Sequence, residues 1–109
     1  MASTMIPINA EVTNAATTLY TAFQVGGATE ADLVSIDLQN KTTSEITVDV
    51  WIESAGAVVR LLADDMPLRP KAHAAWRGLV TMNTAGQLVR AQASVAASID
   101  ALGAVRENA

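Results

Sequence analysis

The sequence contains no cysteine, which excludes disulfide bonds, thiolate metal sites and thiol nucleophiles. Its single histidine, His73, has no second ligand or acid–base partner at a recognisable spacing. The pair Asp64-Asp65 lacks the glycine and further acidic residues of a calcium-binding loop, and neither a Gly-x-Ser-x-Gly elbow nor a phosphate-binding glycine loop is present. We therefore expect no catalytic residues, no cofactor, no metal and no enzymatic activity.

Long apolar runs and an excess of positive charge are also missing. No run approaches the roughly 20 residues that a helix needs to cross a bilayer, and Met1–Met5 lacks the features of a secretory signal. The formal net charge of −4 disfavours free nucleic acid as a ligand, because phosphate binding requires a basic surface. These features predict a soluble protein that binds neither a membrane nor free nucleic acid.

Aromatic residues are scarce, with two Trp, one Tyr and one Phe in 109 residues. The core must therefore consist mainly of Val, Ile, Leu and Ala. Such a thin core predicts modest stability for an isolated copy, and association with other copies would increase that stability. The composition thus favours a homo-oligomer.

The segment from Glu45 to Glu53 alternates strictly between apolar and polar residues. Because successive side chains of a strand point to opposite faces, this pattern predicts a strand with one buried and one exposed face. Trp51 interrupts the polar side, between Asp49 and Glu53. It is either covered by the protein's own loop or N-terminal arm, or it anchors a protein–protein contact.

Acidic residues predominate between positions 11 and 53, and basic residues between positions 60 and 90. If the two segments form different surfaces, the domain can dock through opposite charges on copies of itself or on a larger partner. The alternative is a mixed surface on which the charges are solvated. The residues expected at a protein interface are Asp49, Trp51, Glu53, Arg60, Arg69, Lys71 and Arg77.

Seven or so strand-like segments at spacings near ten residues predict a single all-β domain over residues 17–109. The expected fold is an antiparallel sandwich or barrel of about seven to eight short strands. Residues 1–16 show no periodicity and are expected to form an extended N-terminal arm that is dispensable for folding. The predicted strands are 17–23, 33–39, 45–53, 58–63, 72–82, 87–93 and 98–105.

The segments between and within these strands carry finer predictions. The polar turn at 40–43 predicts a hairpin between the strands at 33–39 and 45–53. Val59, Leu61 and Ala63 are expected to face inward, and the prolines in 64–70 predict a crossover between sheets. A bulge is expected near Gly78. The apolar residues of 91–104 also fit a helix, so this segment is either part of the last strand or helical.

The order of these elements resembles that of small β-sandwich structural proteins of tailed bacteriophages, above all capsid decoration (cement) proteins. The resemblance implies a virion structural protein without catalysis, made in the host cytoplasm and located on the capsid surface. It implies a homo-oligomer, with a trimer favoured, that clamps neighbouring subunits of the major capsid protein. The segments that carry it are Thr17–Ala22, Leu33–Lys41, Ile46–Ile52, Met66–Leu68, Ala85-Gly86 and Leu88–Ser94.

Two other functions are open at this point. A head–tail (neck) protein or a tail or fibre accessory protein would keep the virion role at a different place in the particle. A carbohydrate-binding β-sandwich module would need a platform of aromatic side chains, for which Trp51 is the leading residue.

Overall fold

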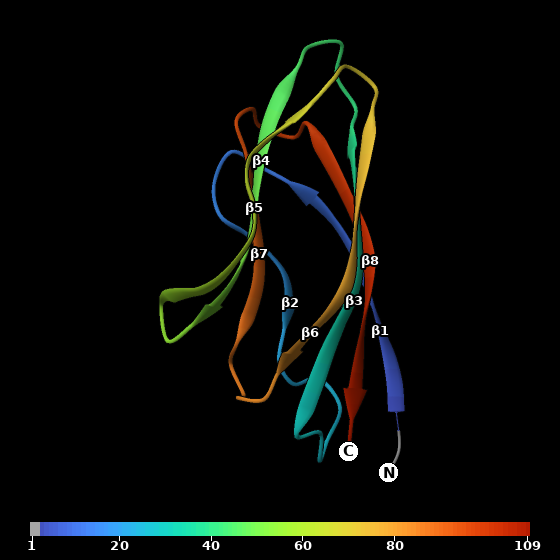
Figure 1. Ribbon diagram of the computed structural model, residues 1–109, viewed down its shortest axis with the longest axis vertical. Coiled ribbons are helices and arrows are strands. Elements are labelled where there is room, and N and C mark those ends of the chain that lie inside the picture. Colours follow the sequence, from blue (N-terminus) through green and yellow to red (C-terminus); the bar gives the residue numbers. More distant parts are fainter. Residues whose placement is uncertain (1–2) are drawn as a thin grey trace.

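The computed structural model describes residues 3–109, which form two four-stranded antiparallel sheets packed face to face (Figure 1). The strand order is β1-β8-β3-β6 in one sheet and β2-β7-β4-β5 in the other, so the predicted all-β sandwich is confirmed, and it is not a closed barrel. Residues 3–109 contain no helix that could cross a membrane. The strands are β1 (Ser3–Val12), β2 (Thr17–Thr21), β3 (Glu30–Asn40), β4 (Ile46–Ser54), β5 (Ala57–Leu68), β6 (His73–Met82), β7 (Leu88–Ala93) and β8 (Ile99–Asn108).

The alternating segment forms β4, and its apolar side chains enter the core as predicted. Each of them is at most 3% exposed, and the neighbouring strand β7 contributes a second alternating set. Fully burying an aliphatic side chain of this size stabilises the fold by about 1.5–3 kcal/mol. The buried residues of the two strands are Ile46, Val48, Val50 and Ile52 of β4, and Val89, Ala91 and Ala93 of β7.

The N-terminal segment is part of the fold, so the prediction of an arm is wrong for residues 3–12. They form β1, which pairs antiparallel with β8 along its whole length and places Ser3 opposite Asn108. Ile8 and Val12 point into the core and are 2% and 0% exposed. Pro7 is tolerated here because β1 is an edge strand, where one side of the backbone needs no ladder partner.

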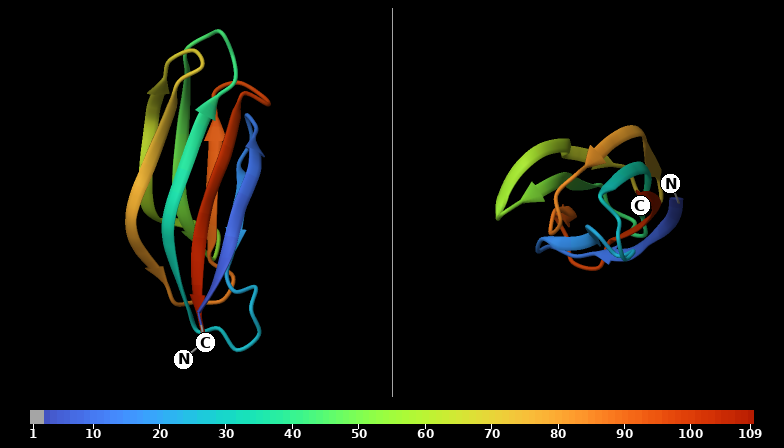
Figure 2. Two further views of the ribbon diagram at one scale, coloured as in Figure 1. Left: turned by 90° about the vertical axis from the view of Figure 1, so that its right-hand side faces the viewer. Right: turned by 90° about the horizontal axis from the view of Figure 1, so that it is seen from below.

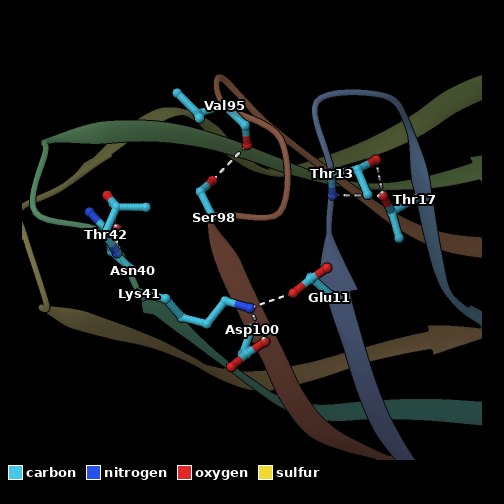
Figure 3. A network of polar contacts seen from close by, with 9 residues as sticks. All are labelled: Glu11, Thr13, Thr17, Asn40, Lys41, Thr42, Val95, Ser98 and Asp100. Carbon is cyan, nitrogen blue, oxygen red and sulfur yellow. Dashed lines mark hydrogen bonds and ion pairs between the residues drawn. The ribbon is translucent and has the colours of Figure 1, made fainter.

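Strands β3 and β4 lie in different sheets, so the hairpin predicted between them is wrong. The residue that redirects the chain is Asn40, which is completely buried at the end of β3. Its side-chain amide donates hydrogen bonds to the main-chain oxygens of Ser44, Leu68 and Arg69, at 2.8, 3.1 and 3.0 Å. Its Oδ1 accepts a hydrogen bond from the N–H of Thr42, which lies beside it in Figure 3. These bonds hold the connection across the sandwich.

For the later part of the chain, the predictions agree more closely with the structure. The crossover after β5 is confirmed, but it is shorter than predicted, because β5 continues through Asp64-Asp65 to Leu68 and residues 69–72 make the connection. The bulge near Gly78 is confirmed by a register shift between β3 and β6. The last segment is the strand β8, so the helical alternative for 91–104 is wrong.

A buried carboxylate, that of Glu107 on β8, holds the loop between β2 and β3. It accepts hydrogen bonds from the Tyr20 hydroxyl and from the main-chain N–H groups of Gln24 and Val25, the last two at 2.8 and 2.7 Å. Burial alone would raise the pKa of Glu107, but these donors favour the ionised form and hold its pKa below the ordinary value. Burial and the adjacent carboxylate also raise the pKa of Tyr20 above its usual range.

Replacing this carboxylate by an amide, Glu107→Gln, should lower the free energy of unfolding by about 1–3 kcal/mol at neutral pH, because a buried donor loses its acceptor. Since the native pKa of Glu107 lies below the unfolded-state value, the carboxylate contributes stability above about pH 4.3 that is lost as the pH falls through the native pKa. Urea unfolding at a series of pH values should therefore show a smaller loss on acidification for the variant than for the parent.

A second buried carboxylate should contribute to the acid sensitivity in the same way. Burial would raise the pKa of Asp32, but hydrogen bonds from Arg106, Thr81 and Asn108 lower it, so Asp32 also contributes to acid sensitivity. Asp32→Asn and Glu107→Gln should each remove part of that sensitivity, and the double variant more than either. Equal acid sensitivity in the parent and in Glu107→Gln would contradict the role assigned to Glu107.

Candidate interaction surface

One side of the sandwich is closed and the other is open. On the closed side β1 packs beside β2, whereas on the open side the edge strands β5 and β6 diverge. The tip of the β4–β5 hairpin projects from the body (green to yellow-green in Figure 1, and in the right-hand view of Figure 2). The β4–β5 pairing is interrupted by register shifts on both sides of Val50 and after Ile52. Because bulges increase the local twist of a strand, these shifts turn the hairpin away from β6.

The projecting hairpin carries large aliphatic side chains that the protein itself leaves uncovered. Val58, Val59 and Leu61 of β5 are 59%, 57% and 54% exposed, and we call these three residues the hairpin patch. Leu79 of β6, which is 63% exposed, lines with Val59 an open cleft of about 260 Å³. Several large apolar side chains exposed on one projecting segment are typical of a site that binds another molecule.

The hairpin patch corrects the prediction that Val59 and Leu61 face inward. The residues of β5 that pack against the core here are Leu62 and Ala63, of which only Ala63 was expected to do so. The cause is visible in the sequence, where Val58-Val59 and Leu61-Leu62 are consecutive apolar pairs. Alternation cannot decide which face of such a strand is buried.

A small apolar pocket of about 80 Å³ lies deeper between the two edge strands. None of its lining side chains is titratable, so the pocket can receive an apolar group but offers no general acid or base. It therefore adds to the apolar character of the open side. The lining residues are Leu38, Val50, Leu62, Ala63, Met66, Ala75 and Trp76.

Trp51 lies half-buried on the outer face of β4, next to the hairpin patch. Its Nε1 donates a hydrogen bond to Oε1 of Glu53 at 3.2 Å, and the Glu53 carboxylate lies 3.3 Å from Nη1 of Arg90 on β7. Leu61 is the partner of Trp51 in the β4–β5 register. Strand β1 does not cover this indole, because β1 belongs to the opposite sheet. The structure thus brings together two predicted interface residues and adds Arg90, which the sequence did not single out.

The other predicted interface residues are spread over the molecule. Asp49 lies on β4, and Arg60 lies on β5 between Val59 and Leu61 of the hairpin patch. Arg69 and Lys71 are on the connection between β5 and β6, and Arg77 is on β6 of the opposite sheet. The seven predicted residues therefore do not form one site, and those near the hairpin are Asp49, Trp51, Glu53 and Arg60.

Three carboxylates lie together beside the hairpin. Oxygen atoms of Asp49, Asp64 and Asp65 are all within 4.8 Å of one another, and Oδ1 of Asp49 accepts a hydrogen bond from the N–H of Asp65 at 2.6 Å. Within residues 3–109, no Lys, Arg or His side chain forms an ion pair with any of the three. We call them the acidic cluster, and they concentrate negative charge close to the hairpin patch.

Charges on the opposite sheet are paired locally. The Nζ of Lys41 lies 3.1 Å from Oδ1 of Asp100 and also pairs with Glu11, as Figure 3 shows. These hydrogen bonds raise the pKa of Lys41 above its ordinary value. Nη1 of Arg77 lies 3.0 Å from Oδ1 of Asp37. Acids and bases that are separate along the sequence thus meet on this face, which is a mixed surface.

No family model matches the chain, and no curated protein matches it at a significant level. The surfaces of the open side are therefore the features from which a function can be inferred.

Proposed function

We propose that this chain is a non-enzymatic structural protein of a bacteriophage virion, which binds and stabilises the outer capsid shell as an oligomeric decoration protein. The observation that supports a binding role is the hairpin patch, because a partner that covers it gains about 25 cal/mol for each Å² of apolar surface removed from water. The virion role comes from the resemblance in strand order and turns to small phage β-sandwich proteins. The proposed partner is the major capsid protein.

The polar groups beside the patch suit such a contact. Trp and Arg are enriched among the residues that dominate binding energies. Next to the hairpin, Trp51 donates a hydrogen bond to Glu53, and Arg90 forms an ion pair with the same carboxylate. These hydrogen bonds fix the indole and guanidinium before binding, which reduces the entropy lost on association. The expected contact has an aliphatic centre and a partly charged rim.

The double variant Val58→Ser/Leu61→Ser should bind particles at least about tenfold more weakly than the parent, because two aliphatic contacts are lost. Purified protein would be added to particles assembled without it, and the bound copies would be quantified by mass spectrometry. Leu102→Ser is the matched control, since Leu102 is similarly exposed (51%) but lies on β8 of the opposite sheet.

The saturating copy number tests the location. A decoration protein should reach a number comparable to that of the major capsid protein. A small fixed number of copies, confined to one vertex, would instead identify a neck protein. If the double variant bound as fully as the parent, the hairpin patch would not be part of the contact.

A further inference from the structure

Strand β5 is a long edge strand with one unpaired side. Its 12 residues pair with β4 on one side only, and within residues 3–109 no strand pairs with the other side. The segment is rich in Val, Leu and Ala, so its unpaired backbone and exposed aliphatic side chains favour the addition of another strand.

The charges of β5 are arranged to match those of a second β5 running in the opposite direction. Arg60 is its single basic residue and forms no ion pair within residues 3–109. The two acidic residues of the strand, Asp64 and Asp65, follow Arg60 by four and five positions and belong to the acidic cluster. In an antiparallel pair centred on Leu62, Arg60 of each copy lies opposite Asp64 of the other copy, so the same attraction occurs twice.

We propose that the partner of this edge is a second copy of the chain, bound through antiparallel β5–β5 pairing about a two-fold axis at Leu62. The same register places Val58 opposite Met66 of the other copy, and Leu61 opposite Ala63. A shift by one residue in one direction would place Arg60 opposite Asp65 but Leu61 opposite Asp64, and a shift in the other direction would place Arg60 opposite Ala63. Only the register centred on Leu62 pairs Arg60 with an acidic residue and keeps Leu61 opposite an apolar one. The pairing joins the two β2-β7-β4-β5 sheets into one continuous sheet across the dimer.

This contact needs only the chain itself, so it stands or falls independently of the virion role. It also satisfies the unpaired backbone of the β5 edge and brings the unpaired Arg60 to the acidic cluster of the other copy. A two-fold contact closes on itself and leaves no further copy of the edge exposed.

Charge reversal tests the pairing in the purified chain. Sedimentation velocity over a concentration series should show a dimer for the parent, and dimerisation at least about tenfold weaker for Arg60→Glu and for Asp64→Lys/Asp65→Lys. An equimolar mixture of the two variants should restore the dimer, because each copy then offers the charge that the other needs. Arg69→Glu, a charge reversal outside β5, should leave the dimer unchanged. All substitutions are at exposed positions, and thermal melts would confirm folding, with Arg60→Gln as the milder variant.

The outcomes separate clearly. Loss of the dimer in each variant and its recovery in the mixture support the pairing. A parent that stays monomeric, a trimer or other oligomer that resists both reversals, or a mixture that does not recover the dimer would each overturn it.

Discussion

Deleting residues 1–12 should unfold the protein or leave it only marginally stable. The deletion removes β1 and with it the burial of Ile8 and Val12, each of which contributes about 1.5–3 kcal/mol. It also exposes the edge of β8 along ten backbone pairs, from Ser3–Asn108 to Val12–Ile99. Domains of this size are stable by only about 5–15 kcal/mol, so the loss is a large share of the total.

Circular dichroism and urea unfolding of the truncated chain would measure this effect. The control keeps the strand and changes only its outer face: Met5→Ser replaces a side chain that is 56% exposed, and it should fold normally. A truncated chain with the unfolding midpoint of the full chain would restore the original expectation of a dispensable arm.

Of the glycine-to-alanine substitutions, Gly103→Ala should lower the free energy of unfolding the most. A Cβ at this position would lie 2.1 Å from the main-chain oxygen of Ser35 and 3.1 Å from the Cα of Ile36. These atoms belong to the backbone of β3, which pairs with β8 and cannot yield as a side chain can. We expect a loss of about 3 kcal/mol or more, and a fall in Tm of more than about 12 °C.

Gly26→Ala is the matched control, because the same Cβ added at Gly26 meets no atom within 4 Å. Differential scanning calorimetry of the two variants would separate close packing from a general intolerance of alanine. If Gly103→Ala melted within a degree or two of the parent, the close approach of β8 to β3 would be wrong.

The parts of the fold that could be predicted are those in which one face alone is buried. β4 follows this rule, and its alternation identified both the strand and its inner face. Strand β1 was not predicted, because Pro7 and Ala10 weaken the alternation of apolar and polar residues, although Ile8 and Val12 are core residues. The β3–β4 crossover was not predicted because a polar turn is also typical of a hairpin. The sequence does not show that Asn40 is buried and bonds to the main chain of Ser44, Leu68 and Arg69.

The candidate surface was predictable in part. Trp51 and Glu53 were singled out because they occupy the polar side of β4, and they do lie beside the exposed patch. Val59 and Leu61 of the patch were expected to face inward, because the alternation rule treats a strand with adjacent apolar pairs as if only one of its faces were apolar. Val58-Val59 and Leu61-Leu62 are better interpreted as apolar on both faces, which predicts a strand with one face on the core and the other available to a partner.

The antiparallel pairing of β1 with β8 has a mechanical consequence. Ser3 and Asn108 are partners in the β1–β8 register, and these ends of β1 and β8 lie side by side at one end of the molecule (Figure 1). Tension applied to these two residues would separate β1 from β8 starting at this end, so that the residue pairs of the ladder break one after another. Each pair contributes little by itself, so the sandwich resists little force in this direction. A partner that places this protein under tension must therefore hold it through its sheets and not through its ends.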